Sequence, residues 1–409
     1  MAVFPRLPIE LWIHVLDLAT RPSDEPNICY VPFDINPSFQ TCSSSETRTR
    51  SAIVLVCKQW RAIGLCVLYR DLFIRDNLHS LMHTIPGSSQ PKPGFRNSCV
   101  RRVILPYTQT AARPPSAGPC PAVMILEACP NVEVLVRPQC KPGEMFRLQF
   151  DHPMSTPSLL SVRRLDWWHD HFAYRTGGIN YLPDVIHQAP NIEYLTLAGD
   201  MLPNTFIHRG LELPKLKVLR LRGVNPIYIR HITTWHFPSL THVVLESLYQ
   251  SFTFSLLRDA IARQIECVEL GRHMHFLTFD LLSMIISGCP NLRELNFYVF
   301  FALPPLITDA HTALQRLGLH AAPNVSMEER ISPWQEIWAH ARAFTNRETF
   351  PSLSEVVLYG KYWDNLIHGL QAEDEFHNFK HSFEALGISV TMQQVGAMSS
   401  FDGVCKFVC

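Results

Sequence analysis

The sequence predicts an α/β fold in which a short N-terminal helical segment precedes a long array of repeated units that share one parallel sheet. Before residue 75, two segments place their apolar residues at helical spacing. From residue 99 onward, a short pattern of alternating apolar residues returns ten times, and stretches of helical character lie between its copies. Repetition of strand and helix is typical of a parallel sheet covered by helices.

The first element, Leu7 to Ala19, is expected to form a helix. Its strongly polar residues Glu10, His14 and Asp17 are spaced i, i+4 and i+7 and fall on one narrow stripe, whereas the rest of its surface is apolar. Pro8 suits the first helical turn, where a missing N–H costs nothing. The wide apolar surface indicates that this helix packs against two neighbours rather than one.

The next stretch, residues 20–50, is rich in Pro, Ser, Asp and Asn and has no apolar period, so we expect a long exposed loop. Ile53 to Tyr69 then returns to helical spacing, with Val56, Trp60 and Ile63 on one stripe. Two short helices cannot bury this much apolar surface against each other, because so small a unit has a poor ratio of volume to surface. We therefore expect another surface to cover them.

These residues resemble a known motif. "LPIELWIHVLDLA" followed by "LVCKQWRAIG" is similar to the two halves of an F-box, the segment by which substrate receptors of SCF-type ubiquitin ligases bind a Skp-family adaptor. The resemblance assigns adaptor binding to Leu7, Pro8, Leu11, Val15, Val56, Cys57 and Trp60. Residues 20–50 separate the halves, as in the expanded F-box-like proteins of mushroom-forming fungi, which "LYRDL" at Leu68 to Leu72 also resembles.

The repeated pattern is aliphatic-x-x-aliphatic-x-apolar, as in "CPNLRELNF" from Cys289 and "FPSLSEVVL" from Phe350. Each copy predicts a turn followed by a short strand. The first aliphatic residue of each copy is Val100, Val132, Val162, Ile192, Leu216, Leu240, Ile265, Leu292, Leu314 or Leu353. "LGISVTM", Leu386 to Met392, is expected to form a last strand. Amphipathic stretches such as "LPDVIHQA" and "PWQEIWAHARAF" predict helices between strands.

The spacing of most copies and the "CPNL" and "CPNV" sequences resemble leucine-rich repeats. The resemblance implies a solenoid whose strands line a concave contact face. We therefore divide the chain into an F-box-like domain (1–75), a linker (76–98), a leucine-rich-repeat-like solenoid (99–395) and a C-terminal tail (396–409).

Residues between the core positions of each strand are expected to face the concave side and bind a protein target. The predicted target-binding residues are Asp166, Trp168, Arg220, Arg222, Glu246, Glu269, Tyr298 and Tyr359. Mixed charges with aromatic rings suit a protein epitope. Arg220 and Arg222 fit either of two interpretations, a site for a phosphorylated target or a solvated pair on a strand face, and the second is the simpler.

Composition argues against several other classes. Thirty-six basic residues balance thirty-six acidic ones, so the sequence predicts no nucleic-acid or membrane partner. Twelve cysteines without a C-x-x-C pair predict reduced thiols, with Cys129 and Cys289 buried. The histidine-rich "WWHDHF" and "HMH" sequences lack a complete ligand set, and catalytic motifs are missing, so we predict no metal, no cofactor and no catalytic residue.

The sequence thus predicts a non-catalytic substrate receptor of an SCF-type ubiquitin ligase, cytoplasmic or nuclear, that joins an adaptor and a cullin-based ligase to a protein target. Two alternatives stay open. One is a leucine-rich-repeat scaffold whose degenerate F-box does not engage a ligase. The other is a hydrolase or metalloenzyme that uses the histidine-rich loops. In a substrate receptor, Cys57 would belong to the predicted adaptor surface. In a scaffold, it would be plain core packing.

Overall fold

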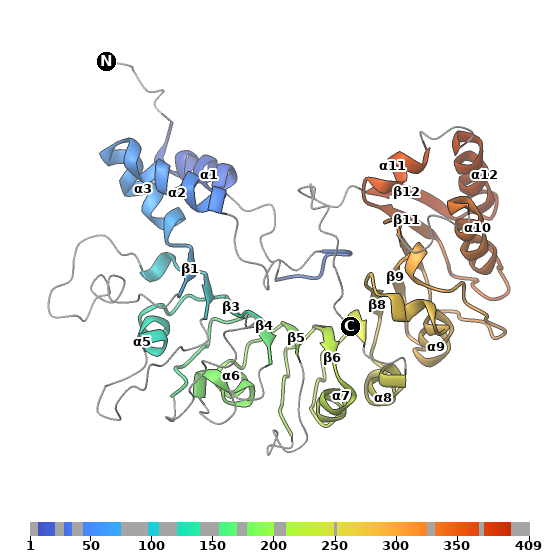
Figure 1. The fold of residues 1–409 in the computed structure, drawn as a ribbon, viewed down its shortest axis with the longest axis horizontal. Helices are drawn as coiled ribbons and strands as arrows, with labels where there is room; N and C mark the ends of the chain where they lie inside the picture. The colour runs from blue at the N-terminus through green and yellow to red at the C-terminus, as the bar shows by residue number, and fades with distance from the viewer. Residues whose placement is uncertain are drawn as a thin grey trace. The chain divides into compact units, whose positions relative to one another are not determined.

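A computed structural model describes residues 7–20, 28–34, 44–74, 97–105, 121–139, 155–169, 178–199, 210–248, 252–324, 332–367 and 372–393. Helices alternate with parallel strands (Figure 1), which confirms the predicted α/β class with a parallel sheet. The chain forms two compact units, one of residues 1–30 and 36–265 and the other of residues 31–35 and 266–409. In this division, the N-terminal helices belong to the same unit as the first seven strands.

Three helices form the N-terminal part of unit 1: α1 (Ile9–Thr20), α2 (Ser44–Val56) and α3 (Lys58–Leu68). Their small core consists of Leu16, Ile53, Ile63 and Val67, with Trp12 and Trp60 packed against it. Helix α1 agrees with the predicted helix at Leu7 to Ala19. The predicted helix at Ile53 to Tyr69 is instead two helices, because the backbone of Cys57 is extended.

The predicted exposed loop at 20–50 is shorter than expected, because α2 already begins at Ser44. Arg50, which lies in this helix, has a buried side chain. Its Nη1 lies 2.5 Å from Asp71 Oδ2, and its Nε and Nη2 donate to the carbonyl oxygen of Thr20. Phe33, also in the predicted loop, is only 2% exposed.

Seven strands of unit 1 pair in parallel and in chain order. Figure 1 shows the helices that follow them on one side of the strands. The strands are β1 (Asp71–Phe73), β2 (Arg102–Ile104), β3 (Val134–Arg137), β4 (Arg164–Trp168), β5 (Tyr194–Ala198), β6 (Val218–Val224) and β7 (His242–Leu248). The helices are α5 (Pro121–Ala128), α6 (Leu182–Gln188), α7 (Pro226–Ile232) and α8 (Phe252–Ile261).

Unit 2 repeats this arrangement with five parallel strands, again in chain order. The strands are β8 (Cys267–Leu270), β9 (Glu294–Tyr298), β10 (Arg316–His320), β11 (Glu355–Tyr359) and β12 (Ser389–Gln393). The helices are α9 (Leu281–Gly288), α10 (Pro333–Phe344), α11 (Tyr362–Ile367) and α12 (Ala372–Glu384).

The predicted strand positions are confirmed. All ten aliphatic residues that open the repeated pattern are buried, none more than 2% exposed, and a strand begins two residues after each of them. The last predicted strand, Leu386 to Met392, overlaps β12. The predicted helices at "LPDVIHQA" and "PWQEIWAHARAF" coincide with α6 and α10.

Alternate residues of each strand serve two different faces of the sheet. In unit 2, Phe297 of β9 points to the helices, since its ring lies 5.1 Å from His340 and 6.1 Å from Phe344, both on α10. Its neighbours Asn296 and Tyr298 point the other way. We call these the helix-covered face and the opposite face, and we use the same terms for unit 1.

The cysteines follow the prediction in part. Cys129 and Cys289 are buried as expected, and burial raises the pKa of the Cys129 thiol to about 12, which makes it inert. Cys66 and Cys99, however, form a disulfide with a Cα–Cα distance of 5.1 Å. The sequence did not predict this pair, because its partners are 33 residues apart and meet only when β1 pairs with β2.

Candidate functional site

The three N-terminal helices carry a surface of exposed apolar side chains. The described part of the chain has sixteen exposed large hydrophobic side chains, and half of them lie here. We call this the helical apolar surface: Leu7, Ile9, Leu11, Ile13, Val15, Leu18, Leu55 and Val56. Helix α1 exposes so much because only the side with Trp12 and Leu16 packs on the small core. Apolar side chains exposed in such number on so short a segment are typical of a site that binds another protein.

Most of the predicted adaptor-binding residues belong to this surface or border it. Leu7, Leu11, Val15 and Val56 are 41–56% exposed, and Pro8 and Cys57 are also exposed. Trp60 differs, because it is half-buried with its ring 5.5 Å from the ring of Trp12. That contact brings the two separated sequence segments together.

Cys57 has a local structural role. It is the N-cap of α3, with extended backbone angles, and its Sγ accepts a hydrogen bond from the backbone N–H of Trp60 at 3.4 Å. An N-cap side chain satisfies one of the unpaired N–H groups at a helix start. The thiol is exposed, so it is neither plain core nor part of a cluster of metal ligands among the described residues.

The opposite face of unit 1 carries several charged side chains that pair with each other, beside apolar ones such as Tyr194, Val218 and Val244. The side chains of Arg164 and Asp166, on β4, are both fully buried, with Nε 3.0 Å from Oδ2. Thr196 on β5 donates to the same carboxylate. The Arg164 guanidinium also stacks over the ring of Tyr194, 4.2 Å from its centroid. The predicted target-binding residue Asp166 is therefore enclosed by its own neighbours.

Glu246 lies between two arginines on the same face. Arg220 Nη1 is 2.8 Å from Glu246 Oε1, and Arg222 Nε is 3.5 Å from Oε2. A register shift after Leu221, which pairs Arg222 with Ser247, allows both contacts. Arg220 is buried, whereas the Arg222 side chain is 39% exposed. The two arginines thus form neither a solvated pair nor an open phosphate site, and accessible surface remains on Arg222, Glu246 and the half-buried Trp168.

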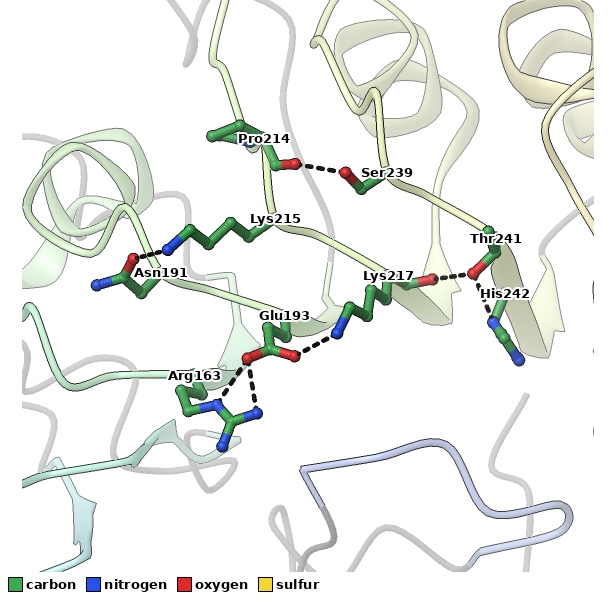
Figure 2. Close-up of polar contacts among 9 residues, drawn as sticks. All are labelled: Arg163, Asn191, Glu193, Pro214, Lys215, Lys217, Ser239, Thr241 and His242. Atoms are coloured by element: carbon green, nitrogen blue, oxygen red, sulfur yellow. Dashed lines mark hydrogen bonds and ion pairs between the residues drawn. The ribbon is translucent and has the colours of Figure 1, made fainter.

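The turns before the strands of unit 1 carry a row of polar contacts (Figure 2). Glu193 accepts from Arg163 Nε at 2.7 Å and from Lys217 Nζ at 2.8 Å, and these bonds lower the pKa of its carboxyl to about 2. Two residues earlier in the same two turns, Lys215 donates to Asn191 Oδ1 at 2.7 Å. Because the same turn recurs, side chains from successive turns align, and the row joins one repeat to the next.

The opposite face of unit 2 is aromatic. Tyr298 on β9, His320 on β10 and Tyr359 on β11 are directly paired in register, so their rings form a row across three strands. Phe33 inserts its ring against all three, with centroids 5.0 Å from Tyr298, 5.2 Å from His320 and 5.0 Å from Tyr359. We call Glu269, Tyr298, His320 and Tyr359 the aromatic site.

The aromatic site also holds Phe33 by a backbone hydrogen bond and contains a buried histidine. The backbone N–H of Phe33 donates to Glu269 Oε2 at 2.8 Å. Burial, with a smaller effect of the Arg272 charge, lowers the pKa of His320 to about 3, and its Nδ1 accepts from the Ala322 N–H. Gly360, with φ +88°, leaves the space that the imidazole fills, since a Cβ there would meet His320 Nε2 at 2.6 Å.

The sequence placed Glu269, Tyr298 and Tyr359 on one face but did not predict that Phe33 would lie on them. The available signal was the short apolar run "YVPF" inside an otherwise polar stretch.

The histidine-rich sequences form no metal site in the part of the chain that the structure describes. His169 is buried, and His171 lies outside the described residues. His273 and His275 stack with ring centroids 5.0 Å apart. Within the described ranges, no group of three or more His, Cys, Asp or Glu side chains is arranged to hold a metal ion, and no helix has the length and apolar content needed to span a bilayer.

Comparison with known proteins adds no assignment: no protein-family model matches the chain, and no curated protein is significantly similar to it. The function must therefore be inferred from the two surfaces described above.

Proposed function

We propose that this chain is a substrate-receptor subunit of an SCF-type ubiquitin ligase. In this proposal, α1, α2 and α3 act as an F-box-like segment that binds a Skp-family adaptor. The repeated strands act as a leucine-rich-repeat-like solenoid that holds a protein target. The receptor would work in the cytoplasm or the nucleus.

The observation that carries the proposal is the helical apolar surface. Six large apolar side chains of α1 and its N-terminal flank, and two at the end of α2, are 41–82% exposed. At roughly 25 cal/mol per Å² of buried apolar surface, their exposure to water is costly unless a partner covers them. An adaptor with an apolar groove would bury them and leave the core of Leu16, Ile53, Ile63 and Val67 intact.

The repeated strands support the second half of the proposal. Strands that pair in chain order, with a helix between many of them, present a row of alternate side chains on one face. In such a receptor the mechanism is proximity. The target is held near the enzyme that carries ubiquitin, and the partner subunits perform the chemistry.

Copurification of the full-length chain with a Skp-family adaptor tests the proposal. The variants Leu11→Asp and Val56→Asp change half-exposed side chains, so the helices should stay folded. We expect each to weaken adaptor binding at least tenfold, because a carboxylate would be buried at the interface. Leu306→Asp is the matched control, since Leu306 is 84% exposed in unit 2 and its change should leave binding unaltered.

A wild-type chain that does not bind the adaptor, or binds it no better than Leu11→Asp and Val56→Asp, would refute the receptor and favour the scaffold alternative. Stoichiometric zinc in the purified chain would instead favour the metalloenzyme alternative.

A further inference from the structure

We propose that the aromatic site of unit 2 is a peptide-binding pocket for an aromatic side chain at the tip of a proline-containing turn, and that the chain's own segment Val31–Asp34 is an exchangeable occupant of it. The inference deepens the proposed function, because it names the class of target and a means of regulation. Its test needs no ligase component.

Phe33 is the buried residue of its segment, whereas Val31 is exposed and Pro32 and Asp34 are half-buried. One ring enclosed by three aromatic side chains, with its flanks near solvent, is how a peptide anchor binds a pocket.

The segment adopts a turn that its own residues disfavour. Asp34 N–H bonds to the Val31 carbonyl at 3.3 Å, with Pro32 and Phe33 at the two central positions of the turn. Phe33 has φ +56°, in the left-handed region that a bulky side chain rarely adopts. A type II turn normally has glycine or asparagine there. The segment therefore does not favour this turn by itself, and the pocket selects it.

The pocket contacts both the ring and the backbone of its occupant. Glu269 is buried and accepts the backbone N–H of Phe33, a group that every non-proline residue provides. The aromatic row selects the ring, and the carboxylate selects a turn that presents its N–H beside it. The pocket thus recognises a Pro-aromatic turn and not the remaining side chains, so a target with the same turn would fit.

The occupant and the pocket lie far apart along the chain. Phe33 and Glu269 are 236 residues apart, and a tethered occupant binds at the effective concentration that the tether sets. A free peptide must compete with it, so the apparent affinity falls by the fraction of time the pocket is open.

The test measures binding of a fluorescein-labelled peptide with the sequence of residues 30–34, YVPFD, to the full-length chain by fluorescence anisotropy. We expect Phe33→Ala to bind it at least tenfold more tightly than wild type does, and wild type to bind weakly but saturably. Phe279→Ala removes an exposed phenylalanine of the same unit and should behave as wild type. A peptide with alanine in place of phenylalanine should not bind.

Tyr359→Leu in the Phe33→Ala background should reduce binding at least tenfold, which assigns it to this pocket. If Phe33→Ala does not fold, Phe33→Leu replaces it, because leucine keeps most of the volume without the ring. Equal affinity of wild type and Phe33→Ala, or binding by neither, would overturn the proposal. So would binding by Phe33→Ala alone with none by wild type up to millimolar peptide, because Phe33 would then be a fixed part of the core. These outcomes leave the adaptor experiment unaffected.

Discussion

The opposite faces of the two units differ in chemistry. In unit 1, Arg164, Asp166 and Thr196 lie on this face and pair with one another. In unit 2, the last residues of β9, β10 and β11 are Tyr298, His320 and Tyr359, whose rings contact the ring of Phe33 from another part of the chain.

In both units the backbone fixes where alternate side chains point. The chemistry of those side chains decides whether another group must cover them. A charge on a buried strand can be neutralised by the next strand, because parallel register places the partner beside it. Rings in the same register leave a surface that another ring can cover. We expect the stability of unit 1 to depend on its internal charge pairs, and the stability of unit 2 to depend on the space beside Gly360.

The largest effect is expected from breaking the buried pair of unit 1. Asp166→Leu would leave the Arg164 guanidinium buried without its carboxylate, and the free energy of unfolding should fall by about 4 kcal/mol. The double variant Arg164→Met, Asp166→Leu removes both charges and should lose much less. Urea denaturation of both variants measures the difference in the free energy of unfolding. Equal losses would contradict the interpretation that Arg164 and Asp166 neutralise each other.

A second, smaller effect should follow from filling the space in unit 2. Gly360→Ala would place a Cβ 2.6 Å from His320 Nε2 at a φ of +88°, and we expect a loss of about 3 kcal/mol in the free energy of unfolding. Gly210→Ala is the matched control, since its φ is +86° and nothing lies within 4 Å, so it should lose only about 1 kcal/mol. Denaturation of both variants separates backbone strain from the clash. Similar losses would show that the row of rings is not tightly packed.

The smallest effect concerns pH. The folded chain keeps His320 neutral down to about pH 3, whereas the unfolded chain binds this proton near pH 6.5. As pH falls from 6.5, the unfolded state therefore gains a proton that the folded state lacks. Stability should decrease by about 1.4 kcal/mol per pH unit, or about 2 kcal/mol at pH 5.

His320→Gln should remove this part of the pH dependence, as measured by denaturation at pH 7 and pH 5. His377→Gln, at an exposed histidine of α12 in unit 2, is its control and should keep the full dependence. An unchanged slope in His320→Gln would mean that His320 is protonated in the folded chain.

The strand array could be predicted from the sequence, because burial of one aliphatic residue and the period of two determine each strand. The break at Cys57 could not, since the apolar spacing from Ile53 to Tyr69 continues across it and only the extended backbone of that residue interrupts the helix. The helix before residue 50 was missed because Arg50 is stabilised by Asp71 and Thr20, contacts that local sequence does not reveal.

The candidate surfaces were predictable to different degrees. Apolar excess in a short helix is visible in sequence, and four of the eight residues of the helical apolar surface, Leu7, Leu11, Val15 and Val56, are among the predicted ones. Whether a strand residue is accessible depends on what lies over it. Asp166 and Tyr298 were predicted to face the same side of their strands as a target, but the first is covered by its neighbours and the second by Phe33.

The constant two-residue interval between each buried aliphatic residue and its strand has an evolutionary consequence. Successive copies are separated by 22 to 39 residues, yet every strand starts at the same place within its own copy. Connections can therefore gain or lose residues without altering which side chains share a face. Insertions in the connections are therefore independent of substitutions in the strands. Selection can change the opposite face one side chain at a time while the lengths of the connections vary.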